Sequence, residues 1–449
     1  MTTAKSHKKA TQIAFIDLFA GLGGTRIGLE RAIQKAGLKS KCVFTSEIKP
    51  HAISAYKKNF NNEDVHGDIT IIDESEIPNF DILMAGFPCQ PFSSAGSRKG
   101  FLDTRGTLFF DIERILAAKK PTAFLLENVE GLKTHDRIDT TKPIGRTLET
   151  ILARLQNLGY KVTWKILDAS LYGVPQKRKR IYIVGTKDSV VDLDNLPEKP
   201  SKFGDVLEKD VNRDKYLETR FTKQLLAHYS LAELKGKQIK DKRGGDNNIH
   251  SWDIEIKGKV SIEQKELLEE ILKQRRRKSW VSGKGFGWSD GMPLTLAEIK
   301  TFYQKPQTIF KYDPNYDEHK YNDELKMMLD DLVTKGYMVK EKPKKAPDSY
   351  EQGYNIVAGK LSFEISHILD PEKPTPTLVA TDVTRLAVVD EIGLRRLEVK
   401  EGLKLFGFPE DYQLNDVINY GEAFDLLGNS VSVGVIELVA SRLIKAMNQ

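Results

Sequence analysis

The chain has 449 residues and carries 69 Lys or Arg against 63 Asp or Glu, a formal net charge of +6. This length allows two or three domains, and the small positive excess permits nucleic acid as a partner without requiring it. The two cysteines, Cys42 and Cys89, exclude a disulfide framework and fit a reducing compartment. The sequence shows neither a signal peptide nor an apolar run as long as a membrane helix, so we expect a cytoplasmic protein without membrane contact.

The first 187 residues alternate short apolar runs with longer amphipathic segments, as βαβ units do. The expected strands are 13–18, 42–46, 81–85, 122–126, 161–167 and 180–185. The expected helices are 26–36, 50–59, 110–119, 145–158 and, near the end of the chain, 433–447. Strands joined by helical crossovers predict a doubly wound α/β sheet, which binds its ligands at the C-terminal ends of the strands.

The alternation stops after residue 185, and Pro197 and Pro200 mark a boundary. Residues 200–350 show no regular βαβ pattern and form a second domain or a large insertion. Within this region, residues 235–278 contain 13 Lys or Arg against 8 Asp or Glu. Much of the positive excess of the chain therefore gathers here, which favours a nucleic-acid contact.

An apolar strand runs into a glycine-rich turn and then into a helix in FIDLFAGLGGTRIGLE, residues 15–30. Such glycines let a cofactor approach the backbone beside a helix N-terminus, although any tight strand-to-helix turn also favours glycine. Two acids follow, Glu47 in TSEIK and Asp68 in HGDIT. An acid after the second strand of such a fold commonly binds ribose hydroxyls, and one after the third can hold an adenine amine. Each acid alone could equally be an ordinary helix cap.

Cys89 lies in AGFPCQPFSSAG, directly after an expected buried strand and between two prolines that would stiffen the loop. A cysteine is more often a small buried hydrophobe, but this place at the active edge of an α/β sheet favours a nucleophile. The strand in TAFLLENVEGL ends in Glu127, which would supply its partner. In PQKRKRIYIVG, Arg178 and Arg180 project to one face and Lys179 to the other, unless the run is only a solvated strand end.

In chain order, DLFAGLGG, the SE pair, GDIT, GFPCQPFS, ENV, QKRKR, RRLEVKEGLKLFGFP and GNSV resemble the successive motifs of the cytosine-C5 DNA methyltransferases. The resemblance extends from about residue 13 to residue 431. It implies a doubly wound mixed α/β sheet of the S-adenosylmethionine-dependent methyltransferase type, with a second, irregular target-recognition domain. We expect a basic tail at 1–12, a catalytic and cofactor-binding domain at 1–197 with 420–449, and a recognition domain with a hinge at 198–419.

The resemblance assigns the chemistry to Cys89, Glu127, Arg178 and Arg180. Cytosine C5 is too weak a nucleophile to attack a methyl sulfonium until a nucleophile has added at C6, and a thiolate adds readily and leaves again. Cys89 would add at C6 while protonated Glu127 donates to N3 and accepts from the exocyclic amine. Arg180, with Arg178 nearby, would hold the cytosine O2 and steady the Cys89 loop. The activated C5 would then take the methyl group of S-adenosylmethionine, and a base, which could be water, would remove the C5 proton.

For the cofactor, the resemblance implies that Phe19 lies against the adenine, that Glu47 binds the ribose and that Asp68 accepts from the adenine amine. The other residues expected at the cofactor site are Gly21, Gly23, Ile48, Ile69, Leu108 and Asn429. Several relatives have an aromatic residue where Ile48 stands, so the adenine would be held less tightly here. The product would be S-adenosylhomocysteine, and no metal is expected.

A stacked duplex hides C6 from attack, so the target cytosine must flip out of double-stranded DNA. We expect Gln90 and the run Arg275, Arg276 and Arg277 to contact DNA, the arginines at its phosphates. Because the run follows an acidic helix at 263–270, it could instead be a solvated helix end. The compact plan resembles a prokaryotic or phage modification enzyme, which would act as a monomer and have a cognate restriction endonuclease as its functional partner.

Three other functional classes share part of this pattern. A tRNA methyltransferase branch resembles the same motifs, but a recognition segment as long as residues 200–350 fits a sequence-specific DNA enzyme better. Another RNA class uses two catalytic cysteines, and Cys42, inside an expected strand, offers no second nucleophile. A dinucleotide-dependent oxidoreductase would leave Cys89 and the arginine pair unexplained, and the full GxGxxG spacing is missing. A DNA-binding regulator without catalysis would have a broken active site, whereas every expected catalytic group is present.

Overall fold

The computed structural model describes residues 12–87, 108–209, 211–242, 244–285, 291–303, 318–344, 346–357, 363–379, 382–414 and 418–449. The chain divides into two compact units. The first unit comprises Met1–Asp210, Pro371–Thr384 and Leu397–Gln449, and the second comprises Val211–Asp370 and Arg385–Arg396. Segments 198–210, 371–384 and 397–419, which we expected in the recognition domain and hinge, are therefore assigned to the first unit.

The first unit is built on a six-stranded sheet with the strand order β2-β1-β3-β4-β6-β5. Its strands are β1 (Gln12–Leu18), β2 (Lys39–Ser46), β3 (Ile82–Gly86), β4 (Ala123–Val129), β5 (Lys161–Asp168) and β6 (Lys179–Thr186). Its helices are α1 (Gly24–Lys35), α2 (Pro50–Asn59), α3 (Leu108–Lys119), α4 (Arg146–Asn157), α12 (Val399–Lys404), α13 (Tyr420–Asn429) and α14 (Val433–Met447). The strands and helices expected in the first 187 residues are confirmed, with ends shifted by a few residues, and so is the final helix.

The order of the strands reverses at β1. This strand pairs in parallel with β2 on one side and with β3 on the other, and β3 pairs in parallel with β4. β6 runs antiparallel to both β4 and β5, so the sheet is mixed. In a doubly wound sheet, ligands bind at the carboxyl ends of the strands, where the order reverses. The expected fold class is confirmed, and it directs attention to the carboxyl ends of β1 to β4.

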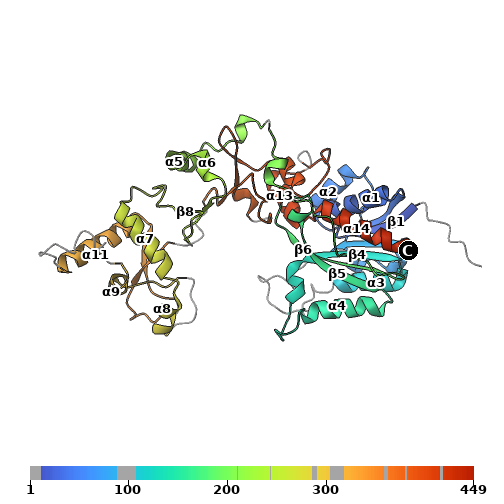
Figure 1. Cartoon of the computed structure of the whole chain (residues 1–449), viewed down its shortest axis with the longest axis horizontal. Coiled ribbons are helices and arrows are strands. Elements are labelled where there is room, and N and C mark those ends of the chain that lie inside the picture. Colours follow the sequence, from blue (N-terminus) through green and yellow to red (C-terminus); the bar gives the residue numbers. More distant parts are fainter. Residues whose placement is uncertain are drawn as a thin grey trace, which may run out of the picture. The chain divides into compact units, whose positions relative to one another are not determined.

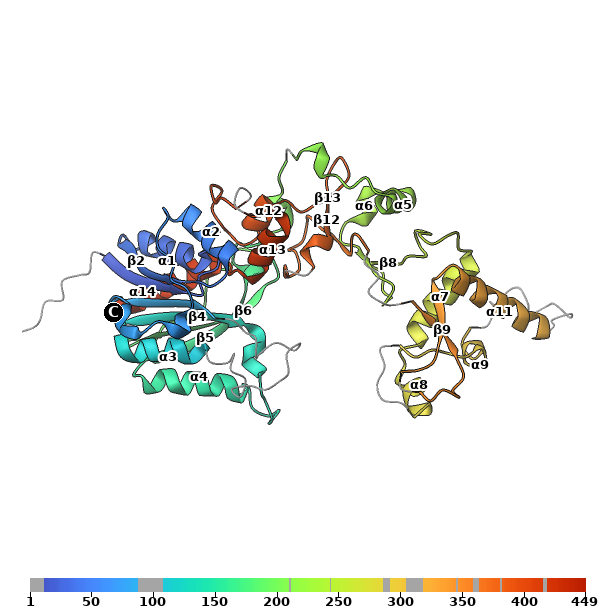
Figure 2. The ribbon, with the colours of Figure 1, turned by 180° about the vertical axis from the view of Figure 1, so that it is seen from behind.

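Side chains that alternate along each strand supply two cores, one on each face of the sheet. Phe15 of β1 packs in the cluster that contains α1 and α14, whereas its neighbour Ile16 packs in the cluster that contains α3 and α4. Figure 1 shows these two helical layers on opposite faces of the sheet, and Figure 2 shows them from behind. Residues 420–447 include an 18-residue window that is apolar enough to cross a membrane, but 67% of that window is buried inside the protein. α14 thus supplies one core of the first unit.

The contact between α1 and α14 depends on a glycine of the glycine-rich motif. A Cβ atom at Gly28 would lie 2.6 Å from Cγ2 of Ile436 on α14. A larger residue would force the two helices apart, so this glycine serves helix packing rather than cofactor binding.

The described part of the second unit contains a five-stranded sheet, β13-β12-β11-β7-β8, and a two-stranded sheet, β10-β9. The strands are β7 (Gln238–Ile239), β8 (Asn248–Ile249), β9 (Met338–Glu341), β10 (Gly353–Ile356), β11 (His367–Leu369), β12 (Leu386–Val389) and β13 (Leu394–Arg396). The helices are α5 (Arg220–His228), α6 (Leu231–Leu234), α7 (Ile262–Gln274), α8 (Lys278–Gly283), α9 (Leu296–Lys300) and α11 (Glu318–Thr334). One apolar cluster includes residues of the larger sheet, and another joins α7 and α11 to the smaller sheet. Such short strands explain the absence of a regular βαβ pattern in this part of the sequence.

Candidate active site and cofactor site

The expected site residues of the first unit follow consecutive strands at the carboxyl edge of the sheet. Phe19 and the glycine-rich turn follow β1, Glu47 follows β2, and Glu127 lies near the end of β4. Cys89 and Gln90 come after β3 in the chain but lie outside the described residues. Glu127 and the candidate cofactor residues therefore lie at the carboxyl edge of the sheet. The chain segment that contains Cys89 begins at this same edge, after β3.

The turn after β1 adopts left-handed backbone conformations. Phe19, Gly21 and Gly23 have φ angles of 57°, 54° and 73°. Apart from Gly21 itself and its two chain neighbours, no described atom lies within 4 Å of the position that a Cβ of Gly21 would occupy, so the turn is open there to a ligand. At Gly23, in contrast, a Cβ would lie 2.5 Å from the ring of Phe60. Gly21 therefore fits a cofactor that approaches the backbone, whereas Gly23 accommodates an aromatic ring of the protein itself.

Glu47 is held in place at the end of β2 and is only 8% exposed. Its Oε2 accepts a hydrogen bond from the amide of Gly21 at 2.8 Å. Its Oε1 accepts from the amides of Ile48 and Lys49 at 2.8 and 2.9 Å. These bonds join the glycine-rich turn to the end of β2. Because a carboxylate offers about four lone-pair sites and these amides use three, Glu47 can still accept about one further hydrogen bond, as from a ribose hydroxyl.

Asp68 caps the short 3-10 helix η1 (Ile69–Ile71), and its Oδ1 accepts from the amide and the hydroxyl of Thr70 at 3.0 and 2.8 Å. Asp68 thus has the helix-cap role that we considered as its alternative. Because Asp68 is exposed, its carboxylate can also bind a ligand. Ile69 is 2% exposed, so its side chain packs in the core rather than against a ligand. Arg114 of α3 fixes η1 by donating to the carbonyl oxygen of Ile69 at 2.5 Å.

Three further cofactor candidates are accessible on the first unit. Ile48 has 66% of its surface exposed, so it offers an apolar face without being enclosed. Leu108 is half-buried at the first residue of α3. Asn429 is exposed at the end of α13, and its side-chain amide donates to the carbonyl oxygen of Asp425 at 2.8 Å. A ligand could therefore reach all three side chains.

Glu127 is a buried acid beside a cation. It is 7% exposed, and Nε of Arg180 lies 3.1 Å from its Oε1. The antiparallel pairing of β4 with β6 brings the end of one strand to the start of the other, which explains this contact. Burial raises the pKa of Glu127, and Arg180 and Arg178 offset only part of that rise. Such a carboxyl group keeps its proton to a higher pH than an exposed one and can serve as a general acid.

Arg178, directly before β6, has different contacts from Arg180, although the sequence predicts that both project to one face at the start of this strand. It is 3% exposed and donates to the carbonyl oxygens of Gly428 and Ser430 at 3.1 and 2.5 Å. Burial lowers its pKa to about 9, because a desolvated guanidinium charge is unfavourable. Its donors hold the turn between α13 and α14, which gives Arg178 a structural role beside the one expected for it near Arg180.

Asn128 fixes the point at which the Cys89 segment begins. Its side-chain amide donates to the carbonyl oxygen of Phe87 at 3.1 Å, and its Oδ1 accepts from the amide of Val129 at 2.8 Å. Phe87 is the last described residue before that segment. The Glu-Asn pair of β4 therefore supplies both a candidate acid and an anchor for the end of β3.

Asp17 of β1 is a buried carboxyl group that the motif pattern did not single out. It is 0% exposed, and its Oδ1 accepts from the hydroxyl of Thr25 on α1 at 2.7 Å. Burial raises the pKa of Asp17 to about 7, and the bond from Thr25 opposes this rise only in part. The signal in the sequence is one charged residue inside the apolar run FIDLF. Asp17 ties β1 to α1 below the glycine-rich turn.

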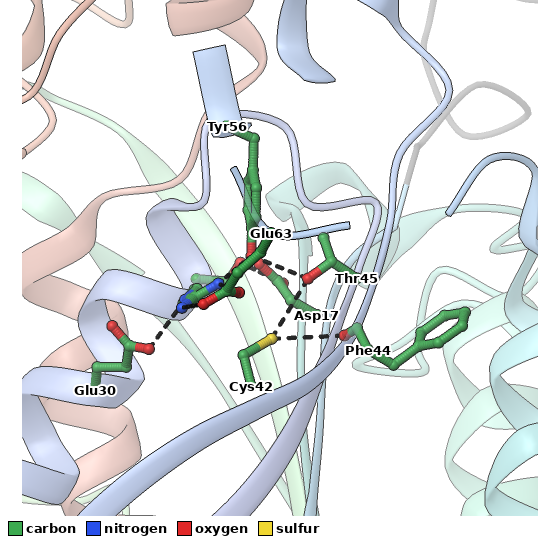
Figure 3. Close-up of polar contacts among 9 residues, drawn as sticks. Asp17, Glu30, Cys42, Phe44, Thr45, Tyr56 and Glu63 are labelled. Carbon is green, nitrogen blue, oxygen red and sulfur yellow. Dashed lines mark hydrogen bonds and ion pairs between the residues drawn. The ribbon is translucent and has the colours of Figure 1, made fainter. Parts of the chain in front are cut away.

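Cys42 lies in β2 and is half-buried, with its Sγ 3.4 Å from Oγ1 of Thr45. Burial raises the pKa of this thiol to about 11, so it stays protonated near neutral pH. Figure 3 shows Cys42 near the side chains of Asp17 and Thr45. These are the properties of a structural cysteine rather than of a second nucleophile.

The three arginines of the second unit differ in burial. Arg275 is 1% exposed, and its Nη1 donates to Oδ1 of Asn355 at 2.6 Å and to the carbonyl oxygen of Ile356 at 3.3 Å. It directly follows α7 and ties this helix to β10, so its burial and its bonds within the protein disfavour the expected phosphate contact. Arg276 is half-buried and Arg277 is exposed, so these two remain candidates for DNA contacts.

The chain is similar to known DNA methyltransferases along nearly its whole length. Residues 13–445 match the family model for C-5 cytosine-specific DNA methylases. The chain is 52% identical over 443 residues to the Type II methyltransferase M.NlaIV of Neisseria lactamica, covering 97% of this chain and 100% of the relative. It is 39% identical over 453 residues to the Type II methyltransferase M.BanI of Aneurinibacillus aneurinilyticus, covering 96% of each.

Solved structures share the fold at low sequence identity. The Entamoeba histolytica methyltransferase EhMeth gives a TM-score of 0.52 at 17% identity, covering 97% of this chain and 98% of that chain. The S. pombe Dnmt2 methyltransferase gives a TM-score of 0.50 at 16% identity, covering 97% of this chain and 100% of that chain. With the family match over residues 13–445, the conclusion is that this chain belongs to the C-5 cytosine-specific DNA methylases and is a DNA cytosine-C5 methyltransferase.

Proposed function

We propose that this enzyme flips a cytosine out of duplex DNA at a specific sequence and methylates its C5 through a covalent bond between Cys89 and C6. The observation that carries the proposal is the buried Glu127 at the carboxyl edge of the sheet, with Nε of Arg180 3.1 Å from its carboxyl group. A protonated acid suits the edge of a cytosine, because it can donate to N3 and accept from the exocyclic amine.

The reaction begins when the thiolate of Cys89 adds to C6, which turns C5 into an enamine carbon. As the carbon–sulfur bond forms, Glu127 gives its proton to N3, so negative charge does not build up on the ring. Arg180 stabilises the carboxylate that this transfer leaves behind. S-adenosylmethionine, when bound, supplies an electrophilic methyl group to C5. A base then removes the C5 proton, the electron pair restores the ring double bond, and Cys89 leaves as the thiolate while Glu127 regains its proton.

For the cofactor, we propose that Glu47 accepts from a ribose hydroxyl, Asp68 accepts from the adenine amine, and Phe19 lies against the adenine. Backbone amides already fix the carboxylate of Glu47, so its side chain loses little freedom on binding. The open position at Gly21 would admit the ligand to the turn. Ile48 would contribute an apolar surface without an aromatic face.

We propose that the second unit reads the DNA sequence around the flipped base. The two Type II methyltransferases align with 96–97% of this chain, and so with most of the second unit. Flipping costs a few kcal/mol, which phosphate contacts from exposed cations such as Arg277 would offset. Gln90, next to Cys89, is the residue that we assign to the DNA at the catalytic site.

The relatives are Type II methyltransferases, which suggests a biological context. We propose that the enzyme protects DNA from a cognate restriction endonuclease, as a functional rather than a physical partner. One chain carries every proposed catalytic, cofactor and recognition group, so we expect a monomer that acts on DNA in the cytoplasm.

Bisulfite sequencing of DNA from cells that express the enzyme tests this function, because it reports both the modified base and the surrounding sequence. We expect 5-methylcytosine at one short DNA sequence, and none in cells that express Cys89→Ala. The purified Cys89→Ala protein should still bind duplex DNA. Methyl transfer to tRNA alone, measured in parallel, would defeat the proposal.

A further inference from the structure

A network of charged and aromatic side chains surrounds Arg26 below the glycine-rich turn, and the proposed reaction uses none of them directly. From this network we infer that Arg26 is a positioning residue that holds three cofactor-binding segments in register. The segments are the turn after β1, the end of β2 with Glu47, and the loop that leads to Asp68. The inference rests on the proposed cofactor site.

Arg26 lies in the first turn of α1, and 8% of its side chain is exposed. Its guanidinium donates to both carboxylate oxygens of Glu63, at 2.5 and 3.0 Å, and its Nε donates to Glu30 at 2.9 Å. Glu30 belongs to α1 and Glu63 follows α2, and Figure 3 shows both side chains. The two bonds to Glu63 use the planar fork of the guanidinium, which the ammonium group of a lysine cannot reproduce.

Two aromatic rings connect Arg26 to the glycine-rich turn. The guanidinium carbon lies 4.2 Å from the ring centroid of Phe60, and Nη1 donates to the hydroxyl of Tyr56 at 3.1 Å. The same rings approach the turn closely, because a Cβ at Gly23 would lie 2.5 Å from the Phe60 ring and 3.0 Å from the Tyr56 ring. With so little space, a shift of the guanidinium would move the rings and, through them, the turn.

Tyr56 continues the network to the end of β2. Its hydroxyl oxygen lies 3.1 Å from that of Thr45, a contact that Figure 3 also shows. The carbonyl oxygen of Thr45 accepts from the amide of His66 at 2.8 Å, and the amide of Glu47 donates to the carbonyl oxygen of His66 at 3.0 Å. The backbone of Glu47 is therefore fixed by a strand end and a loop that both connect to Arg26.

Glu63 reaches the same loop from its other end. It lies after α2, three residues before His66 and five before Asp68. The hydroxyl of Ser46 donates to the carbonyl oxygen of Gly67 at 2.8 Å, so this loop is also bound to β2. The pair of Arg26 and Glu63 thereby ties α1 to the residues that present Asp68.

The ion pairs of Arg26 fix the relative positions of α1, α2 and the loop after α2, and they add little to the stability of the folded protein. An ion pair with a buried member often contributes little net stability, because the buried charge, here Arg26, loses its hydration. Its hydrogen bonds are directional, however, and they are satisfied only when α1, α2 and the loop after α2 lie in one arrangement. A site assembled from three separate segments binds its ligand tightly only when these segments are already held in the binding arrangement, because ordering them on binding costs affinity.

Calorimetric titration of S-adenosylmethionine into the full-length enzyme and its Glu63→Gln variant tests the inference. Glu63 is suitable because 41% of its side chain is exposed, so a neutral isostere should leave the fold intact. We expect the dissociation constant and the KM for S-adenosylmethionine to rise about tenfold, while kcat at saturating cofactor stays within about twofold. Arg26→Lys, which keeps the charge and loses the fork, should change both constants in the same direction.

Lys35→Met is the matched control, because Lys35 also lies on α1 and pairs with Glu437 of α14, outside the three segments. It should bind the cofactor as the wild-type enzyme does. Unchanged cofactor binding in both Glu63→Gln and Arg26→Lys, with only a lower melting temperature, would overturn the positioning role. Wild-type enzyme that does not bind S-adenosylmethionine would instead overturn the proposed cofactor site, so the two failures are distinguishable.

Discussion

Nε of Arg180 lies 3.1 Å from Oε1 of Glu127, across the antiparallel pair of β6 and β4. Two effects on this acid oppose each other, since burial raises its pKa and the neighbouring arginines lower it. Burial is the larger effect, so the pKa is raised. The pair thus combines a carboxyl group that keeps its proton with a cation that stabilises the carboxylate once the proton has been transferred.

Glu127→Gln removes the transferable proton and keeps the shape and one acceptor oxygen of the side chain. We expect kcat to fall by about 10²–10⁴-fold, the usual contribution of a general acid, with DNA and cofactor binding retained. Single-turnover methyl transfer at saturating S-adenosylmethionine measures this effect. Glu130→Gln, at an exposed acid just after β4, is the control and should react at the wild-type rate. A loss of less than about tenfold in Glu127→Gln would exclude a general acid at this position.

The raised pKa of Glu127 also predicts how the rate depends on pH. Only the protonated acid can donate to N3, so the wild-type rate should decline as the pH rises through this pKa. An amide does not titrate there, so the decline should be missing in Glu127→Gln. Rate profiles of both proteins test this, and an identical alkaline decline would assign it to another group.

Asp17 should make the stability of the enzyme depend on pH. Its pKa rises from an ordinary value of 3.8 to about 7 in the folded protein because it is buried. The folded state binds the extra proton, so this contribution to stability is complete below the unfolded pKa and is lost as the pH rises through the folded one. Asp17→Asn keeps an acceptor for Thr25 and should remove the dependence, which amounts to at most about 1.4 kcal/mol per pH unit.

Urea unfolding of wild-type protein and Asp17→Asn at about pH 5 and about pH 8 measures this linkage. The variant should gain stability relative to wild type at the higher pH. If the two proteins keep the same difference at both pH values, Asp17 does not titrate between them.

Arg275 is buried and Arg277 is exposed, so we expect their substitution to have different effects on stability and on DNA binding. Arg275→Met should lower stability by about 2–3 kcal/mol, because it removes the bonds to Asn355 and Ile356. Arg277→Met should leave stability unchanged and reduce the slope of log K against log salt by about 1, as the loss of one phosphate contact does. Urea unfolding and DNA titrations at several salt concentrations separate the two. A reduced salt slope with unchanged stability in Arg275→Met would refute the argument from burial.

Much of the first unit could be predicted from local sequence pattern. The strands β1 to β6 are short apolar runs, and the amphipathic segments between them form α1 to α4. Glu47 and Glu127 could be located for a related reason, since each is an acid at the end of such a run. The helix-packing role of Gly28 could not be separated from cofactor binding, because its partner Ile436 lies near the other end of the chain.

Side-chain burial could not be predicted in the same way, because it depends on partners far along the chain. Arg178 bonds to Ser430, 252 residues later, and Arg275 bonds to Asn355, 80 residues later. The sequence of a basic segment does not show whether its side chains face solvent or bind carbonyl oxygens inside a folded unit. Asp17 was missed for the same reason, since its raised pKa arises from burial that exists only in the folded sheet.

Duplex DNA with 5-fluorocytosine at the target position tests most directly whether Cys89 bonds to C6. After methyl transfer, fluorine cannot leave C5 as a proton does, so elimination is blocked and the enzyme remains attached to the DNA. We predict a denaturant-stable adduct that requires S-adenosylmethionine, maps to Cys89 by mass spectrometry and is absent in Cys89→Ala. Methylation of ordinary DNA by an enzyme that forms no such adduct, or an adduct at another residue, would contradict the mechanism.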